Sequence, residues 1–400
     1  MLVVFILSLV SGVFTADLKL VEVLALSRHN MRTPYTAFLN HFTPKRWPVF
    51  DVPPGHLTGK GARMESYMGR YFYEWMASEN LIPEGCPGET VYVYANCQER
   101  TIETARAFVD GAFPGCNVPV HYRTDVDWDP VFNAIIRNKT KKYANAVMKE
   151  MKYKMNLKEY KLKPAYIMMN EIVDLKNSHI CIHEDYCDLS KDKNDIIFKV
   201  GHPPNVTGPL YIGNSIVDVF IMSFYDDKPY EEVGWGLVRT REQWTLLTKV
   251  SKENQNVRYN LTTAGKDLTK PLLEYISDVF LDENKERKFT LLVAHDSNIN
   301  CLTNVLGFKP FHLPNQFEPF PIGGKLVFQK WTDGFNYFMK VDYVYQSWIK
   351  LRYGAEVSLE QPPQIYTMQM KACTVDKDGF CLWSDFVDLL KGTLDRIEQY

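Results

Sequence analysis

The sequence lacks an excess of charge of either sign. Its 46 lysines and arginines nearly balance its 48 aspartates and glutamates, which gives a formal net charge of −2. A chain without a strong positive field has no general attraction for nucleic acid or for an anionic membrane surface. Any anion that the protein binds must therefore be held by a local cluster of cationic side chains.

Long apolar runs are also scarce. Residues 2–14 are almost wholly apolar, but this run is too short to span a bilayer, and no later run is long enough either. Because the run meets Thr15, Ala16 and Asp17, it is typical of a signal-peptide core, and we predict a signal peptide over residues 1–16. A buried N-terminal strand is the alternative, since no cationic segment precedes the run. We therefore expect a secreted, extracellular protein without a membrane span.

Two further features agree with secretion. Eight cysteines suffice for several disulfides in an oxidising compartment. The pairs that we expect are Cys86 with Cys116, Cys181 with Cys187, and Cys373 with Cys381. For Cys97 and Cys301, which lie in or beside apolar segments, we expect buried thiols, with a fourth bridge as the alternative. Asn138, Asn205 and Asn260 each begin an N-glycosylation sequon, which a eukaryotic secretory route would use.

Convincing metal-binding motifs are missing as well. Residues 181–187 read Cys-x-His-x-x-x-Cys, which contains zinc-ligand types, but a disulfide is favoured in a secreted chain. Residues 374–385 imitate a calcium loop, yet threonine holds the first ligand position and aspartate replaces the closing glutamate. We therefore expect neither a metal nor another cofactor.

What the sequence does contain is a cluster of cations after an apolar run. Residues 18–26 are apolar except for Lys19 and Glu22, which indicates a buried strand, and residues 27–34 read Ser-Arg-His-Asn-Met-Arg-Thr-Pro. Arg28 and Arg32 flank His29, and two guanidinium groups can hold the oxygens of a phosphate ester. Ligands of α/β sheets bind just beyond the carboxyl ends of the strands. Taken alone, such a cluster is more often a solvated surface feature.

Two other strand-like runs end in chemically active residues. Residues 289–294 lead into His295 and Asp296, and residues 91–95 lead into a turn with Arg100 at the start of a helix. The free amides of a helix N-terminus favour anions. Each residue has a structural alternative: a satisfied core histidine, a helix cap at Asp296 and a surface arginine. Complementary acid, base and cation chemistry at several strand ends nevertheless rarely arises by chance.

The composition changes in the middle of the chain. Lysines and methionines become dense from about residue 125, and helical spacing replaces strand-like runs up to about residue 255. With 400 residues, of which 46% are hydrophobic, the chain is long enough for two lobes. We predict a catalytic domain formed by residues 17–124 and 256–400, with residues 125–255 inserted as a mainly α-helical domain. The lysines are interpreted as solvated helix faces.

The active-looking segments resemble a known family in combination. Residues 28–34 and the pair His295-Asp296 resemble the two signatures of the histidine acid phosphatases, a branch of the phosphohistidine phosphatase fold. The first signature is usually Arg-His-Gly-x-Arg-x-Pro, and here Asn30 stands in the place of the glycine. Residues 95–101 and 113–116 resemble the segment of the third arginine. The resemblance is closest to the glucose-1-phosphatase type, which also has asparagine in the first motif, and it extends through residues 208–210, 213–215, 235–236, 295–299 and 322–329.

This resemblance implies a fold and a set of roles. The fold class is α/β: a mixed-sheet α/β sandwich domain with an inserted, mainly α-helical smaller domain. His29 is implied as the nucleophile, and Asp296 as the acid that protonates the leaving alcohol. Four residues are implied to hold the phosphate oxygens: Arg28, Arg32, Arg100 and His295. The physical chemistry agrees, because nearby arginines keep a histidine neutral and stabilise a loose phosphoryl-transfer transition state without a metal.

Two more residues are expected to shape the substrate pocket. The side chain of Asn30 is expected to narrow the pocket and to bias the choice of substrate. Asp226 follows Phe224 and Tyr225, near the position where the glucose-1-phosphatase type carries an acidic sugar-site residue after two aromatic residues. A solvated loop acid is the alternative for Asp226.

We therefore predict a secreted, metal-independent acid phosphomonoesterase that hydrolyses a small sugar phosphate such as glucose 1-phosphate through a phosphohistidine intermediate. The expected partner is a small-molecule phosphate ester and not a nucleic acid, and the oligomeric state, including a homodimer, is left open. A phytase or broad-specificity acid phosphatase is the alternative within enzymes. A non-catalytic secreted binding protein of the same fold is the alternative outside them, and the intact His29 and Asp296 argue against it.

Overall fold

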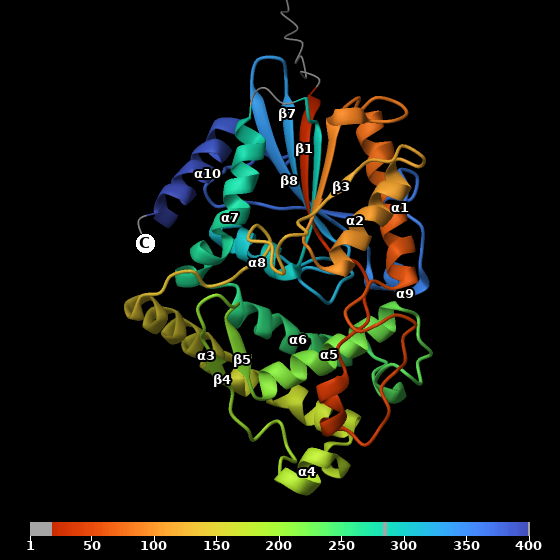
Figure 1. Cartoon of the computed structure of the whole chain (residues 1–400), viewed down its shortest axis with the longest axis vertical. Coiled ribbons are helices and arrows are strands. Elements are labelled where there is room, and N and C mark those ends of the chain that lie inside the picture. Colours follow the sequence, from red (N-terminus) through yellow and green to blue (C-terminus); the bar gives the residue numbers. More distant parts are fainter. Residues whose placement is uncertain (1–17, 283–285, 399–400) are drawn as a thin grey trace, which may run out of the picture.

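The computed structural model describes residues 18–282 and 286–398. The predicted signal peptide lies outside these residues. Figure 1 shows a twisted sheet flanked by helices, and beyond one end of its strands a second part built mainly of helices. Within the described residues, no helix is both long and apolar enough to cross a bilayer.

The strands belong to one large sheet and one short ribbon. They are β1 (Lys19–Arg28), β2 (Val91–Ala95), β3 (Val120–His121), β4 (Asp195–Ile197), β5 (Asn205–Thr207), β6 (Phe289–Ala294), β7 (Lys325–Thr332), β8 (Tyr337–Tyr345), β9 (Gln364–Thr367) and β10 (Phe380–Leu382). In the described part of the chain, the large sheet has the order β10-β8-β7-β1-β6-β2-β3, with β9 also paired to β8, and β4 pairs with β5.

The helices surround the large sheet or form the second, mainly helical part. The α-helices are α1 (Gly59–Ser78), α2 (Glu99–Ala112), α3 (Lys141–Val173), α4 (His179–Glu184), α5 (Pro209–Tyr225), α6 (Arg241–Arg258), α7 (Thr262–Leu281), α8 (Asp296–Val305), α9 (Trp348–Tyr353) and α10 (Trp383–Glu398). Short 3-10 helices cover Ala37–Phe42, Gly88–Thr90, Leu175–Asn177 and Gly234–Gly236.

The large sheet is mixed. Strands β1, β6, β2 and β3 are parallel neighbours, whereas β7, β8, β9 and β10 pair in antiparallel fashion. Arg28, the last residue of β1, is the register partner of Ala294, the last residue of β6. The carboxyl ends of the central parallel strands therefore lie together, at the edge of the sheet that faces the helical part. The expected α/β class with a mixed sheet is confirmed.

Both faces of the sheet are covered, which explains why β1 reads as a nearly continuous apolar run. Leu24 and Leu26 pack into a core cluster that includes residues of α7, α8 and α10. Val23 and Ala25 point to the opposite face and pack with residues of α1 and α2. Figure 1 shows these two groups of helices on opposite sides of the strands. The central strands are thus fixed from both sides, and their loops are held on a rigid support.

The helical part has its own core, formed largely by α3, α5 and α6. The side chain of Thr140 caps α3, and a capping box of Thr240 and Gln243 begins α6. Residues from the loop between β1 and α1, such as Leu39 and Phe42, pack into the same core. Helix α6 continues to Arg258, past the limit predicted at residue 255.

Three disulfides join the expected cysteine pairs. The bonded pairs are Cys86–Cys116, Cys181–Cys187 and Cys373–Cys381. Since both thiols of residues 181–187 are bonded to each other, this segment is not a thiolate zinc site. Cys301 is a buried free thiol, as expected, whereas Cys97 is free but only partly buried. The expectation of a buried thiol at Cys97 is wrong because the residue lies in the turn between β2 and α2, where solvent reaches it.

Candidate active site

Backbone hydrogen bonds hold the loops after three strands together. The N–H of His29, just past β1, donates to the carbonyl oxygen of Ala294 across 3.0 Å. The N–H of Asn96, just past β2, donates to the carbonyl oxygen of Val293 across 3.0 Å. The segments that begin at His29, Asn96 and His295 therefore lie side by side, although about 200 residues separate the last two along the chain.

A cavity of about 550 Å³ opens at this point, between the sheet and the helical part. It collects six of the residues singled out in the sequence: Arg28, His29, Arg32, Arg100, His295 and Asp296. The opposite wall comes from α5 and α6, whose cavity-lining residues recur every three or four positions and so form one face of each helix. From α5 these residues are Tyr211, Asn214, Ser215, Asp218 and Ile221, and from α6 they are Thr248, Ser251, Gln255 and Arg258.

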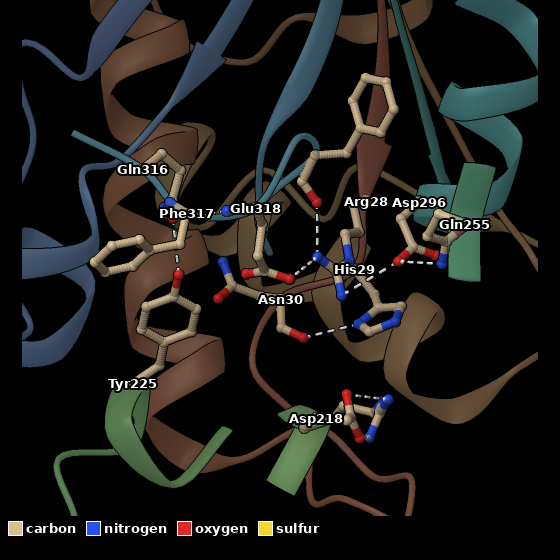
Figure 2. Close-up of polar contacts among 12 residues, drawn as sticks. Arg28, His29, Asn30, Asp218, Tyr225, Gln255, Asp296, Gln316, Phe317 and Glu318 are labelled. Atoms are coloured by element: carbon tan, nitrogen blue, oxygen red, sulfur yellow. Dashed lines mark hydrogen bonds and ion pairs between the residues drawn. The ribbon is translucent and has the colours of Figure 1, made fainter. Parts of the chain in front are cut away.

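His29 is oriented by its own neighbour. Its Nδ1 lies 2.8 Å from the carbonyl oxygen of Asn30, as Figure 2 shows. A carbonyl oxygen can only accept a hydrogen bond, so Nδ1 carries the proton of the neutral ring. The lone pair is then on Nε2. Such a ring is prepared to act as a nucleophile through Nε2.

The surroundings keep both histidines of the cavity neutral. Burial, followed by the positive charge of Arg100, lowers the pKa of His29 well below the ordinary value of 6.5. Burial and the same arginine also lower the pKa of His295. The two rings lie edge to face with their centroids 5.5 Å apart. Adding a proton to either ring would place a new positive charge in a buried site and among arginines, which explains the direction of both shifts.

Arg28 is held by acidic and backbone groups on one side of the cavity. Its Nη1 donates to Oε1 of Glu318 across 2.8 Å and to the carbonyl oxygen of Phe320 across 2.6 Å, while Nη2 lies 3.5 Å from Oδ2 of Asp296. Figure 2 shows the guanidinium between these two carboxylates. Burial alone would lower the pKa of Arg28, but Asp296 and Glu318 outweigh it and raise the pKa. Arg28 is thus a fixed, permanently charged group.

Arg32 is held by a residue of the helical part. Its Nη1 and Nη2 donate to Oδ2 and Oδ1 of Asp218 on α5, each across 3.0 Å. This two-pronged geometry fixes the plane of the guanidinium as well as its position. Asp218 therefore connects the loop after β1 to the opposite wall of the cavity.

Arg100 differs from the other two arginines because it is not held by an acidic side chain. It lies in the first turn of α2, and in the part of the chain that the structure describes no carboxylate forms an ion pair with it. Its Nε is buried without a hydrogen-bond partner. Burial and the charge of Arg32 lower its pKa. A bound anion would relieve this uncompensated charge.

His295 is the N-cap of α8, and Asp296 is the first residue of that helix. The side-chain amide oxygen of Asn96 accepts the backbone N–H of Cys97, so its amide nitrogen faces His295 and donates to Nε2 across 2.7 Å. Neutral His295 therefore carries its proton on Nδ1. Oδ1 of Asp296 accepts the N–H of Ser297 across 2.8 Å.

The other oxygen of Asp296 is held from the helical part. Gln255 on α6 donates its amide N–H to Oδ2 of Asp296 across 3.1 Å, and Figure 2 shows this contact beside the pair with Arg28. The carboxylate is partly exposed, with 27% of the side chain accessible to solvent. Asp296 therefore faces the cavity from a defined position and can exchange a proton with a bound group or with water.

Two expected pocket residues are not brought to the cavity. The side chain of Asn30 turns away from it, because its amide donates to the buried carboxylate of Glu65 across 2.7 Å. The expectation that this side chain narrows the pocket is therefore wrong. Asp226 directly follows α5 and lines a separate hollow, where its Oδ2 lies 3.4 Å from Nζ of Lys228. Burial raises the pKa of Asp226, an effect that Lys228 opposes.

Three polar residues of the site were not found from the sequence: Asp218, Gln255 and Glu318. Asp218 and Gln255 stand on amphipathic helices, where a polar residue normally faces solvent, and Glu318 stands in an irregular loop. Burial raises the pKa of Glu318, and Arg28 opposes that rise. Among the described residues, no group of three or more histidine, cysteine, aspartate or glutamate side chains is arranged as a metal site.

Comparisons with known proteins agree with this geometry. Residues 19–183 match the histidine phosphatase superfamily (branch 2). The chain is 41% identical to a glucose-1-phosphatase of Providencia rettgeri, over 95% of this chain and 93% of that protein. It is 39% identical to a glucose-1-phosphatase of Salmonella typhimurium, over 93% of this chain and 92% of that protein. The crystallised phytase of Citrobacter braakii superimposes with a TM-score of 0.86 at 25% identity, over 94% of this chain and 98% of that one.

Proposed function

Since this chain belongs to the histidine phosphatase superfamily (branch 2) and is a histidine-type acid phosphatase, we propose that it hydrolyses small sugar phosphates such as glucose 1-phosphate through a phosphohistidine at His29. The observation that carries the proposal is the contact of 2.8 Å between Nδ1 of His29 and the carbonyl oxygen of Asn30, which leaves the lone pair on Nε2. Arg28, Arg32, Arg100 and Asp296 line the same cavity.

The reaction proceeds in two displacements. In the first, Nε2 of His29 attacks phosphorus, the bond between phosphorus and the ester oxygen breaks, and Asp296 in its protonated form gives the leaving oxygen a proton. In the second, water attacks the phosphohistidine, the bond between phosphorus and Nε2 breaks, and Asp296 takes a proton from the water. The products are the alcohol and inorganic phosphate, and the enzyme returns to its starting state.

The arginines supply the electrostatic stabilisation. Phosphoryl transfer passes through a loose transition state whose charge is spread over the equatorial oxygens of phosphorus. Arg28 and Arg32 are already positioned by Glu318 and Asp218, so little reorganisation is needed when the charge shifts. While Nε2 of His29 carries the phosphoryl group, the N–H at Nδ1 continues to donate its hydrogen bond to the carbonyl oxygen of Asn30. This hydrogen bond stabilises the positive charge of the phosphorylated ring.

The charge of the cavity favours a monophosphate over phytate. Its wall contains the cations Arg28, Arg32, Arg100 and Arg258 and the acids Asp218, Asp296 and Glu318, and no lysine is present among the described residues that line it. Four arginines against three carboxylates leave little surplus positive charge. Phytate carries a phosphate on every ring carbon and would need many more unpaired cations.

The remaining wall suits a sugar. Asn214, Ser215, Ser251 and Gln255 offer neutral donors and acceptors, which match hydroxyl groups, and Trp128 contributes an apolar surface. Such a combination is typical of small-molecule sites that fix a polar ligand by a few directed hydrogen bonds. Glucose 1-phosphate presents one phosphate and several hydroxyls, and it therefore fits both halves of the cavity.

The disulfides indicate an oxidising compartment. Together with the apolar segment at residues 2–14 this supports secretion after removal of residues 1–16. We further propose that the α/β part and the helical part act as two domains, with residues 125–255 as the approximate extent of the inserted one.

A substrate panel tests the proposed function. The values of kcat/KM for glucose 1-phosphate, phytate and nitrophenyl phosphate are measured from about pH 4 to about pH 7, with and without a chelator. We expect glucose 1-phosphate to be hydrolysed faster than phytate, with no effect of the chelator. Faster hydrolysis of phytate would support the phytase alternative, and no hydrolysis of any ester would support the binding-protein alternative.

A further inference from the structure

Every polar atom of Asn30 is engaged, although the residue lies beside the nucleophile and outside the cavity wall. Its backbone N–H donates to Oγ1 of Thr104 across 3.0 Å, and its carbonyl oxygen accepts from Nδ1 of His29 across 2.8 Å. Its side-chain oxygen accepts the N–H of Met31 across 2.9 Å, and its amide nitrogen donates to Oε2 of Glu65 across 2.7 Å. The carbonyl that orients His29 is therefore itself fixed from several sides.

Glu65 in turn belongs to a buried ion pair. Its Oε1 lies 2.6 Å from Nζ of Lys325, and the side chains of both residues are fully inaccessible to solvent. Nζ also donates to Oγ of Ser27 across 2.9 Å and to the carbonyl oxygen of Gly323 across 3.1 Å. All three protons of the ammonium group thus have acceptors. The pair thus connects α1 and β7 to Ser27 of β1 and to Gly323 in the loop before β7.

The loop before β7 leaves room for Asn30 because it contains glycine. Gly323 has a φ of +65°, and a Cβ at this position would lie 2.4 Å from Nδ2 of Asn30 and 3.3 Å from Oε2 of Glu65. Its N–H also donates to the carbonyl oxygen of His29 across 3.2 Å. The side-chain amide of Asn30 is therefore enclosed between Gly323 and Glu65.

A buried ion pair is a weak source of stability. Removing two charges from water is costly, and an apolar pair of similar volume is often as stable or more stable. Burial lowers the pKa of Lys325, and Glu65 opposes the shift. Because neither residue lines the cavity, direct contact with substrate does not explain the pair. What it does provide is a carboxylate oxygen at the place to which the amide of Asn30 donates.

We propose that Glu65 and Lys325 are positioning residues for the nucleophile and act through Asn30. Lys325 holds Glu65, Glu65 holds the side chain of Asn30, and Asn30 presents its carbonyl oxygen to Nδ1 of His29. This chain of contacts fixes the ring tautomer and aims Nε2 at phosphorus. The proposal rests on the proposed function of His29. In this proposal the side chain of Asn30 anchors the backbone that orients His29. The glycine of the usual signature has no side chain and cannot form such an anchor.

Two single substitutions and their combination test the proposal. In Asn30→Asp a carboxylate faces the carboxylate of Glu65, and the two can coexist only by sharing a proton. In Glu65→Gln the new amide must turn a donor towards either Lys325 or Asn30, both of which are donors. The double variant N30D/E65Q reverses the hydrogen bond, since the introduced glutamine can donate to the introduced aspartate and accept from Lys325. It keeps the net charge and the volume of the wild type.

We expect kcat to fall by about tenfold or more in each single variant, because small misplacements of a reacting atom have large effects on rate. The loss in Asn30→Asp should shrink as the pH falls, because protonation restores a donor between residues 30 and 65. The double variant should recover kcat to within about threefold of the wild type, on the same scale of effects. Inhibition by inorganic phosphate should change much less than kcat in Glu65→Gln, since the arginines are not moved.

A second trio with the same chemistry serves as a matched control. Asn256 donates to Oε2 of Glu253 across 3.0 Å, and Oε1 of Glu253 lies 3.2 Å from Nζ of Lys158. None of the three lines the active cavity. The substitutions Asn256→Asp and Glu253→Gln should therefore leave kcat unchanged, even where they lower the melting temperature.

The proposal is overturned if the single variants at positions 30 and 65 keep the kcat of the wild type. It is also overturned if the double variant melts like the wild type but remains as slow as the single variants. Nitrogen NMR of the wild type and the double variant gives a readout that needs no substrate, since both must show His29 protonated at Nδ1. If the wild type hydrolyses none of the phosphate esters, the proposed function fails, whereas the positioning of the ring is still tested by NMR.

Discussion

Arg32 and Asp218 form a two-pronged ion pair, 3.0 Å at both contacts, that joins the loop after β1 to α5. The pair places a carboxylate within the group of cations that is proposed to hold phosphate. It orients Arg32, and at the same time it opposes the binding of a dianion. The helical part thus supplies the carboxylate that fixes the position of Arg32 and offsets its charge.

Asp218→Asn should separate these two effects. The substitution keeps the shape of the side chain and removes its charge, so inorganic phosphate should inhibit more strongly, by about three- to tenfold. Because Arg32 is no longer held at both nitrogens, kcat should fall. Steady-state kinetics with phosphate as inhibitor measures both the inhibition constant of phosphate and kcat.

Asp226→Asn is the matched control for that experiment. Asp226 is an ion-paired aspartate at the end of the same helix, but it lines a separate hollow with Lys228. Substitution of Asp226 should alter neither the inhibition constant of phosphate nor kcat. Unchanged inhibition by phosphate in Asp218→Asn would refute the electrostatic part of the explanation, and a strong effect of Asp226→Asn on glucose 1-phosphate would restore Asp226 as a sugar-site residue.

Asp296→Asn should affect substrates according to their leaving groups. An alkoxide leaves poorly without a proton, whereas nitrophenolate leaves readily, so the loss of the acid should slow glucose 1-phosphate on the order of 100-fold more than nitrophenyl phosphate. The ratio of the two kcat/KM values, compared between variant and wild type, gives the result. Equal losses of kcat/KM for both substrates would rule out Asp296 as the proton donor. Its contact with Arg28 would then be its remaining role.

The lowered pKa of His29 has a consequence for activity. Because burial and Arg100 hold this pKa well below 6.5, His29 stays neutral in acid where an ordinary histidine is protonated. The acidic limb of the profile of kcat/KM against pH should therefore lie well below pH 6.5, the ordinary value. A loss of activity centred near that ordinary value would contradict the lowered pKa.

The same shift makes stability depend on pH. Below the ordinary histidine pKa the unfolded chain binds a proton that folded His29 does not, so the stabilisation is complete above about pH 6.5 and declines as the pH falls towards the lowered value, by about 1.4 kcal/mol per pH unit for one histidine. His29→Asn should reduce this slope in chemical denaturation between about pH 6.5 and about pH 5. An equal slope in the wild type and in His29→Asn would contradict the account.

The sheet was predictable because its central strands are apolar runs followed by polar turns, and β1 and β6 are buried at nearly every position. Residues 91–95 and 289–294 form β2 and β6 with the limits read from the sequence, since continuous apolar runs followed by polar turns permit few other structures. His29 follows β1, Arg100 lies in the first turn of the helix after β2, and His295 and Asp296 follow β6. Parallel pairing of these strands suffices to bring the segments after them to one edge. The candidate catalytic residues could therefore be recognised before any packing was known.

The residues that position the candidate catalytic side chains could not be predicted from the sequence pattern. Asp218 and Gln255 reach the cavity because α5 and α6 pack against the sheet edge, and a helical pattern does not reveal which partner its polar positions meet. The orientation of Asn30 depends on Glu65 and Gly323, which are far from it in sequence. A sequence identifies the residue at position 30 as unusual, but only the packing around it shows that its side chain points away from the cavity.

Trapping of the phosphorylated enzyme tests the central claim most directly. Wild-type protein and His29→Ala are mixed with glucose 1-phosphate labelled in the phosphate and quenched within the first turnover, and the labelled residue is identified after digestion. The proposed mechanism predicts an acid-labile phosphohistidine at Nε2 of His29 in the wild type and no labelled protein in the variant. Label on another residue, or equal labelling of the variant, would contradict it.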